Sequence, residues 1–181
     1  MKNEIIPTDV WVDGGVILKN PSPHGGTWCY VSWLCRSVLG VAFSQRLHVD
    51  SGYYIDGRNP VTNNQTELYA ALKALEYLPP DWAGTIHTDS KITMFRLTRP
   101  NAGMKGIPKD IVDRLNAAKV RVGNNFTVRL LAGHPTKKQL KEGIGRHGLP
   151  VHAENVFCDR RCQELSKKFQ KEHGLALVNR A

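Results

Sequence analysis

Short apolar segments with alternating or continuous hydrophobicity predict the strands of this chain. Val10 to Val16 and Thr27 to Cys35 are rich in Val, Trp, Tyr and Leu, which is typical of strands. The Pro and Gly rich residues 19–26 between them predict a long hairpin connection, so these two strands are expected to be antiparallel. A third strand is expected within Val38 to Ile55.

Apolar residues at helical spacing predict the remaining elements. From Asn64 they recur with a helical period as far as Leu78, and Pro79-Pro80 ends the run. The residues that follow predict, in order, a buried strand at Thr85 to Thr88, a helix to about Leu97, a helix at Lys109 to Val120, a strand at Phe126 to Leu131 and a helix from Ala153 to about Glu172. The predicted order is β-β-β-α-β-α-α-β-α.

Four carboxylates stand where short polar motifs interrupt this pattern: Asp13, Glu67, Asp89 and Asp159. Two lie on or at the end of predicted strands and two on predicted helices, so one fold can gather them at the edge of a sheet. Two like charges about 4 Å apart at an effective dielectric near 20 repel by roughly 4 kcal/mol. Such a cluster therefore needs cations or bound protons, and we interpret it as a divalent-cation site for phosphodiester cleavage.

Each carboxylate also has a structural alternative. Asp89 could be the N-cap of the helix that follows it, and Glu67 could be the N3 partner of an Asn64 cap. Asp159 could be an exposed helical charge. Asp13 is harder to explain in this way, because Asp is disfavoured inside strands. The hypothesis therefore depends on the four residues as a set.

Composition adds an expected partner. The 181 residues, 41% of them hydrophobic, are sufficient for one compact domain, with a core expected at about residues 9–173. The net charge of +9 favours an anionic polymer bound to a basic surface. The sequence has no signal-peptide core and no apolar run of about 18 residues, so we expect a cytoplasmic protein with no membrane segment.

Two cysteines near the C-terminus suggest a second kind of metal site. Cys158 and Cys162 follow His147 and His152 at spacings that a structural zinc site could use. Cysteines four residues apart on an amphipathic helix are more often packed against a core, and this is the favoured interpretation.

In several ordered motifs the chain resembles the type 1 ribonucleases H. The motifs cover the chain from Val10 to about Lys168 and are Val12-Asp-Gly-Gly15, Asn20-Pro-Ser-Pro-His-Gly-Gly26, Thr62-Asn-Asn-Gln-Thr-Glu-Leu-Tyr-Ala-Ala71, His87-Thr-Asp-Ser90, Gly133-His134 and Asn155-Val-Phe-Cys-Asp159. The resemblance implies an α/β, ribonuclease H-like fold, in which a five-stranded mixed sheet of order 3-2-1-4-5 is flanked by helices.

The resemblance also implies an activity. It is that of an endoribonuclease that hydrolyses the RNA strand of an RNA/DNA hybrid and leaves 5′-phosphate and 3′-hydroxyl ends. Asp13, Glu67, Asp89 and Asp159 would hold two Mg²⁺ ions, with Mn²⁺ as a possible substitute, for two-metal-ion catalysis.

Further residues match positions with roles in the family. Asn20, Thr62, Asn63 and Asn64 match positions that contact the backbone of the hybrid. Lys91 stands where many relatives have a Gln that contacts the substrate.

The catalytic histidine of the family has two counterparts. His134, in a loop after the last strand, is the expected catalytic histidine, and His152 is the alternative, because about fifteen extra residues separate the two. These residues form an insertion from Thr136 to Val151, which we expect to be a basic flexible loop that closes over the hybrid; the alternative is a solvated surface loop.

Two other functions remain open on the sequence. One is a DNA resolvase or exonuclease of the same fold, and the other is a non-catalytic hybrid-binding domain. The presence of all four carboxylates disfavours the second. A free-standing nuclease is expected, monomeric and without an obligate protein partner.

Overall fold

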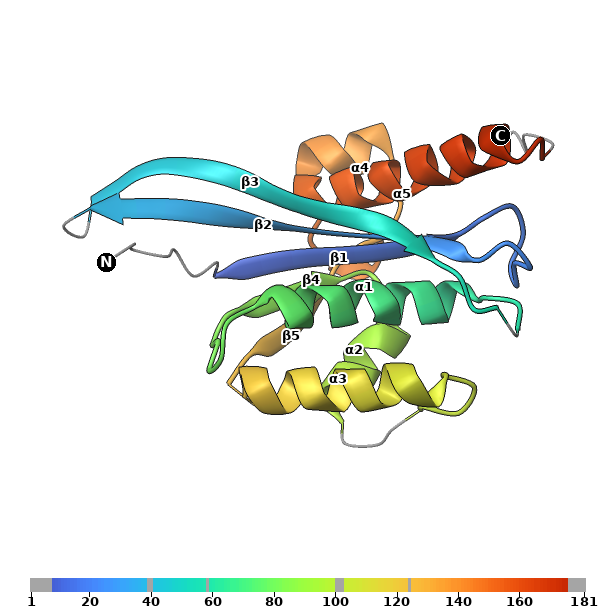
Figure 1. Ribbon diagram of the computed structural model, residues 1–181. Helices are drawn as coiled ribbons and strands as arrows, with labels where there is room; N and C mark the ends of the chain where they lie inside the picture. Colours follow the sequence, from blue (N-terminus) through green and yellow to red (C-terminus); the bar gives the residue numbers. More distant parts are fainter. Residues whose placement is uncertain (1–7, 39–40, 58, 100–102, 124, 176–181) are drawn as a thin grey trace.

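One mixed sheet organises the molecule (Figure 1). The computed structural model describes residues 8–38, 41–57, 59–99, 103–123 and 125–175. The strands are β1 (Asp9–Val16), β2 (Gly26–Val38), β3 (Val41–Tyr54), β4 (Thr85–Thr88) and β5 (Thr127–Leu130). Their order is β3-β2-β1-β4-β5, with β2 antiparallel to both β1 and β3, and β4 parallel to both β1 and β5. The predicted mixed sheet is confirmed.

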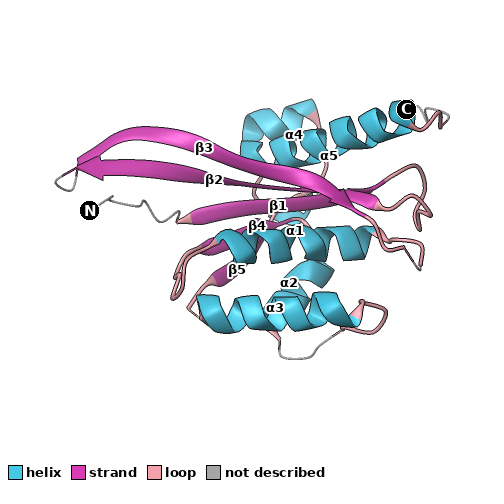
Figure 2. Ribbon diagram, in the orientation of Figure 1, coloured by secondary structure: helices cyan, strands magenta, loops and turns pink. Residues whose placement is uncertain are grey.

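Helices lie on both faces of this sheet (Figure 2). They are α1 (Asn63–Tyr77), α2 (Lys91–Thr98), α3 (Lys109–Val122), α4 (Lys137–Glu142) and α5 (Ala153–Glu172), with a short 3-10 turn at Arg146–Gly148. Helices α1, α2 and α3 lie on one side, and α4 and α5 lie on the other. Every strand and helix predicted from the sequence is present, with ends that differ by a few residues at most.

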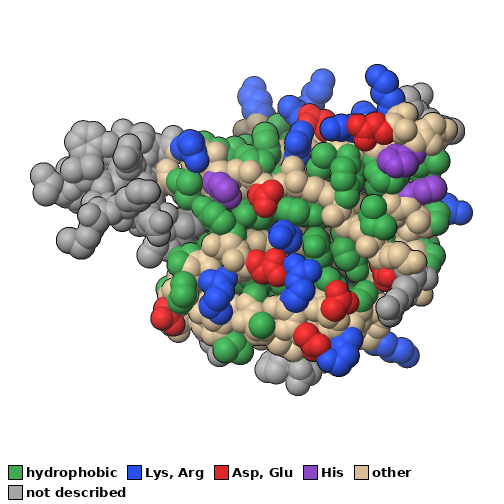
Figure 3. Space-filling model, viewed as in Figure 1, with side chains coloured by type: hydrophobic (Ala, Val, Ile, Leu, Met, Phe, Trp, Pro, Cys, Tyr) green, Lys and Arg blue, Asp and Glu red, His purple; other side chains and the backbone are tan. Residues whose placement is uncertain are grey.

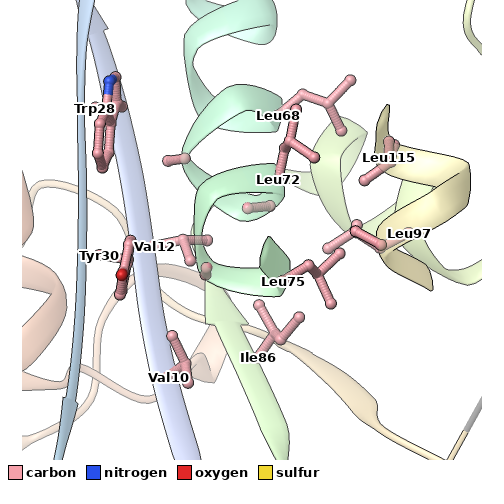
Figure 4. Packing of buried hydrophobic residues seen from close by; sticks show 14 of the residues in the cluster. Val10, Val12, Trp28, Tyr30, Leu68, Leu72, Leu75, Ile86, Leu97 and Leu115 are labelled. Carbon is pink, nitrogen blue, oxygen red and sulfur yellow. The ribbon is translucent and has the colours of Figure 1, made fainter. Parts of the chain in front are cut away.

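The alternation of side chains along β1 divides the core into two clusters. Val10 and Val12 point toward α1 and pack with Leu68, Leu72 and Leu75 (Figure 4). On the other face, Trp11 packs with the cysteines of α5 and with Leu131. Because side chains two residues apart share one face of a strand, Asp13 is on the same side of the sheet as Trp11 and α5.

The insertion at 136–151 is more regular than the sequence analysis predicted. The expectation of a flexible loop is wrong for its first half, because Lys137–Glu142 forms α4. The hydroxyl of Thr136 accepts the Gln139 backbone N–H at 3.3 Å, and the Gln139 side chain accepts the Thr136 N–H at 3.0 Å. This reciprocal pair is a capping box, which stabilises a helix start. An antiparallel bridge between Ile144 and Pro150 closes the second half.

None of the helices in the described part of the chain combines the length and the apolar composition that a bilayer-spanning segment requires.

A close backbone approach at Gly14 fixes α1 against β1. A Cβ atom at this position would lie 2.5 Å from the backbone nitrogen of Glu67 and still closer to the backbone of Thr66. Only glycine allows the first turns of α1 to lie this near the strand. The same contact brings the Glu67 backbone next to Asp13.

We expect Gly14→Ala to lower the free energy of unfolding by about 3 kcal/mol, because the new methyl group meets backbone atoms that cannot rotate away. Urea unfolding followed by circular dichroism measures this change. Gly57→Ala is the control, since a Cβ atom there would meet nothing within 4 Å. Equal stability of the two variants would contradict the importance of this contact.

Candidate active site

Three carboxylates from three different elements meet at one edge of the sheet. Asp13 lies near the end of β1, Glu67 lies in the second turn of α1, and Asp89 directly follows β4. Oxygen atoms of the three lie within 4.8 Å of one another. Because β1 and β4 are parallel neighbours, their carboxyl ends place Asp13 and Asp89 side by side.

The fourth predicted carboxylate is at the side of this group. Asp159, on α5, lines the same cleft but is not part of the tight group of three. Both of its oxygens lie 3.0 Å from the side-chain nitrogen of Gln163, one turn further along α5. His134 Nδ1 is 3.5 Å from Asp159 Oδ2. The structure therefore brings together all four carboxylates that the sequence singled out.

The capping alternatives for Glu67 and Asp89 are wrong. The N-cap of α1 is Thr62, whose backbone N–H donates to the side chain of Gln65 at 2.7 Å. The N-cap of α2 is Ser90, whose hydroxyl accepts the Thr93 N–H at 3.2 Å. Other residues therefore occupy both cap positions, and the two carboxylates need a different explanation.

Burial and mutual repulsion make the charged state of this group unfavourable. Burial, followed by repulsion from Asp89, Asp159 and Glu67, holds the pKa of Asp13 well above its usual range. Burial raises the pKa of Glu67 to about 7, and burial is also the main cause of the raised pKa of Asp89. One oxygen of Glu67 is buried and has no hydrogen-bond partner among the described residues.

This donor set fits a divalent cation. Carboxylate oxygens are the ligands that Mg²⁺ and Mn²⁺ prefer, and an unpaired buried oxygen is available to a cation. A bound cation would stabilise the ionised carboxylates against both burial and mutual repulsion, and would so lower these pKa values. Asp13, Glu67 and Asp89 could hold one, with Asp159 at the edge of the group.

The two candidate histidines lie in different surroundings. His134 is 77% exposed at its side chain, lines the cleft and has a backbone φ of 46°. The preceding Gly133 lies so close to Asp89 that a Cβ atom there would collide with the carboxylate. His152 instead accepts the indole N–H of Trp11 through Nδ1 at 2.8 Å. Only His134 is among the residues that line the cleft.

Of the predicted substrate contacts, the structure places Asn63 in the lining of the cleft. Its backbone N–H donates to the side-chain oxygen of Asn20 at 3.3 Å. Thr62 is the cap of α1, and Asn64 is exposed, with its carbonyl oxygen accepting Arg96 at 3.0 Å. Lys91 is exposed in the first turn of α2.

Three polar residues that support the carboxylates were not selected from the sequence. Asn155 donates a side-chain hydrogen bond to Asp89, and Ser90 donates one to Glu67. Gln163 contacts Asp159, as described above. Asn155 and Gln163 lie four residues before and after Asp159, so all three share one face of α5. That helical spacing was the sequence signal that could have identified Asn155 and Gln163.

The zinc alternative is not supported. Cys158 and Cys162 are buried, and their sulfur atoms lie 3.6 Å from the carbonyl oxygens of Trp11 and Asp13. Among the described residues, the one group able to hold a metal is the set of three carboxylates. The cysteines are packed against the core, as favoured from the sequence.

The carboxylates lie in a cleft of about 350 Å³. The cleft also continues along α5, where it is lined by Gln163, Ser166, Lys167 and Gln170. Val16, Leu18 and Thr27 of the β1–β2 region line it as well.

Comparison with known proteins identifies relatives of this chain. It is 31% identical over 147 residues to a ribonuclease H of Anaeromyxobacter dehalogenans strain 2CP-C, and the match covers 73% of this chain and 76% of that protein. No protein-family model matches the chain.

Two solved structures have a similar fold. LC9-RNase H1, a type 1 RNase H with the type 2 active-site motif, has a TM-score of 0.59 at 16% identity, over 90% of this chain and 74% of that one. LC11-RNase H1 in complex with an RNA/DNA hybrid has a TM-score of 0.51 at 19% identity, over 89% and 97%. These likenesses confirm the predicted ribonuclease H fold.

We expect Glu67→Gln to stabilise the protein in EDTA at pH 8.5 by about 2 kcal/mol. The pKa of Glu67 in the folded state, about 7, is above its ordinary value of 4.5. The contribution of this group to stability is therefore present below about pH 4.5 and is lost as the pH rises through 7, and Gln avoids that loss. Urea unfolding at pH 4.5 and 8.5 measures the difference. Glu164→Gln, on the exposed side of α5, is the control, and the same pH dependence in both variants would contradict the electrostatic account.

Proposed function

The chain belongs to the ribonuclease H family of nucleases, and from this premise we propose that it is an endoribonuclease that hydrolyses the RNA strand of RNA/DNA hybrids, leaving 5′-phosphate and 3′-hydroxyl ends. The observation that carries the proposal is the group of Asp13, Glu67 and Asp89, with oxygens within 4.8 Å of one another in an open cleft. A structural neighbour in complex with an RNA/DNA hybrid supports the choice of substrate.

Four carboxylates would hold the cations, with Asp13, Glu67 and Asp89 as the central ligands and Asp159 as the fourth. Two bound Mg²⁺ ions, or Mn²⁺ in their place, would supply an activated water and stabilise the leaving oxygen of the phosphodiester. The residues of the chain keep these oxygens in place. Asn155 fixes Asp89, Ser90 fixes Glu67, and Gln163 fixes Asp159.

The hybrid would be bound through its backbone and not through its bases. Asn63 lines the cleft, and its backbone N–H donates to the side chain of Asn20; Thr62 and Asn64 adjoin Asn63 in the chain, and Lys91 is exposed. Amide and hydroxyl groups suit phosphate oxygens and the 2′-hydroxyl of RNA. Lys and Arg side chains gather over α4 and α5 on the face shown in Figure 3, which favours an anionic polymer on this side.

His134 would assist proton transfer at the cleaved bond. It is exposed, lines the cleft and lies 3.5 Å from Asp159, so its ring can move between this carboxylate and a substrate oxygen.

We expect metal-dependent cutting of only the RNA strand of an end-labelled hybrid, and its loss in Asp89→Asn by at least about 10³-fold, because a metal ligand is weakened. The measurement compares hybrid with single-stranded RNA, duplex RNA and duplex DNA, in Mg²⁺, Mn²⁺ or EDTA.

Each alternative function has its own outcome in that experiment. Cutting of duplex DNA or a branched junction would favour a resolvase or exonuclease. Tight hybrid binding without any cutting by the unmodified protein would favour a binding domain. Either result would contradict the proposed activity.

We expect His134→Ala to lower kcat by about 10²-fold while leaving the free energy of unfolding nearly unchanged, because the side chain is exposed and acts on protons. His152→Ala is the matched comparison and should lower the free energy of unfolding while leaving kcat nearly unchanged. It removes the acceptor of the Trp11 N–H and should cost about 1 kcal/mol of stability with kcat within twofold. A large loss of kcat in His152→Ala alone would transfer the proton-transfer role to that residue.

A further inference from the structure

The cleft extends well beyond the carboxylates along one face of α5. Asp159, Gln163, Lys167 and Gln170 follow one another at intervals of three or four residues, which places them on one side of the helix. At 1.5 Å per residue, Lys167 lies about 12 Å along the helix from Asp159. The far part of the cleft is therefore too distant to contact the same phosphate as the carboxylates.

The cation in this far part has no acidic partner. Lys167 makes no ion pair among the described residues, whereas two neighbouring cations of α5 do. Arg161 pairs with Glu164 at 3.4 Å, and Lys168 pairs with Glu172 at 3.8 Å. Lys167 thus presents a positive charge, without an ion-pair partner on the described residues, to the same cleft that holds the carboxylates at its other end.

Two uncharged polar groups accompany this lysine. Gln170 is only 6% exposed, and its side-chain nitrogen donates to Ser166 Oγ at 3.0 Å. With its oxygen accepting this bond, the hydroxyl of Ser166 keeps its proton for another acceptor. The oxygen of Gln170 is buried and has no partner among the described residues, which is unfavourable for folding. The hydroxyl donor of Ser166, and not the oxygen of Gln170, is therefore the group of this pair that suits an anionic ligand.

The walls of this part of the cleft are held firmly. The Tyr53 hydroxyl donates to the carbonyl oxygen of Leu165 at 3.2 Å and ties α5 to β3. The Thr27 hydroxyl donates to the carbonyl oxygen of Cys162 at 3.2 Å and ties α5 to β2. Helix α5 lies along the sheet and continues toward the C-terminus beside these strands (Figure 1). These two hydrogen bonds fix α5 against the sheet along this part of the cleft.

We propose that Ser166 and Lys167, supported by Gln170, form a second phosphate subsite for the strand that is cut. The inference rests on the proposed function, because it takes the carboxylates as the place of the scissile phosphate. A stacked strand advances about 3.4 Å per nucleotide along the helix axis, and its phosphates are farther apart than this because the strand winds, so 12 Å corresponds to at most about three or four nucleotides from the cut. An ammonium group and a hydroxyl donor suit a phosphate oxygen, and the continuous cleft connects both positions on one strand.

The test compares Lys167→Gln with Lys168→Gln, two adjacent cations of which only the first lines the cleft. On a long hybrid we expect Lys167→Gln to raise KM about threefold to tenfold with kcat within twofold. It should also reduce the steepness with which the logarithm of the association constant falls with the logarithm of the salt concentration. The expected reduction in slope is about 0.7 to 0.9, the value of one phosphate contact. Lys168→Gln should leave KM and slope unchanged. The same effects in both variants would overturn the subsite.

Shortening the RNA strand locates the contact. Hybrids are trimmed one nucleotide at a time on each side of a fixed cut. The KM difference between Lys167→Gln and the unmodified protein should disappear when about three or four nucleotides or fewer remain on one side. If the difference persists in the shortest hybrids on both sides, Lys167 acts at the cut itself and the subsite is overturned.

Cleavage by the unmodified protein tests the proposed function separately. If it cuts no hybrid, that function fails, and the two variants are compared by equilibrium binding to the same hybrid. A binding defect confined to Lys167→Gln would still support a phosphate site in this cleft. Equal binding of the two variants would overturn it.

Discussion

Burial of the carboxylates Asp13, Glu67 and Asp89 close to one another is the constraint on which the site depends. Burial is the main cause of the raised pKa values of all three, and repulsion between neighbouring carboxylates, whose oxygens lie within 4.8 Å of one another, adds to it. A flexible chain would relieve the strain by moving the charges apart. Here the carboxylates come from β1, α1 and the end of β4, so separating them would require the core to rearrange. The core shown in Figure 4 therefore maintains an arrangement that local electrostatics opposes.

Helix α5 has a different task from that of the central elements. It carries the fourth carboxylate, Asp159, at the side of the cluster. The residues one turn before and one turn after Asp159 form hydrogen bonds to the carboxylates. Asn155 reaches Asp89, and Gln163 reaches Asp159. Because a helix repeats its direction every turn, one face of α5 serves the central carboxylates, Asp159 and the outer cleft in succession. The buried cysteines on the adjacent face keep that helix against β1 and β2.

The sequence predicted the strands, the helices and the carboxylates because these depend on strong local signals, whereas the strand order was implied by the resemblance to the type 1 ribonucleases H. Apolar periodicity located the strands and helices, and polar motifs at strand ends located Asp13 and Asp89. The capping alternatives were wrong, because a cap depends on one residue at the first turn, and Thr62 and Ser90 compete for that role with the polar residues next to them. Helix α4 was missed although Thr136 and Gln139 have capping-box spacing, because its six residues are too short for a periodic pattern. The outer cleft could not be predicted, since it depends on how the β1–β2 region lies against α5.

The protein has a net charge of +9, yet its cleft is acidic, so the net charge alone does not explain how an anionic strand could enter the cleft. An anionic strand approaching four carboxylates meets repulsion, and cations at the site offset it only over a short range because salt screens charges beyond about 10 Å. Attraction must therefore come from groups within that range of the strand but outside the carboxylate group. Lys167 on the cleft wall, which has no ion pair in the part of the chain that the structure describes, meets both conditions, whereas Lys168 and Arg161 are paired with acids on their own helix. The position of each basic residue, and not the net charge of the protein, would thus determine where a strand is bound.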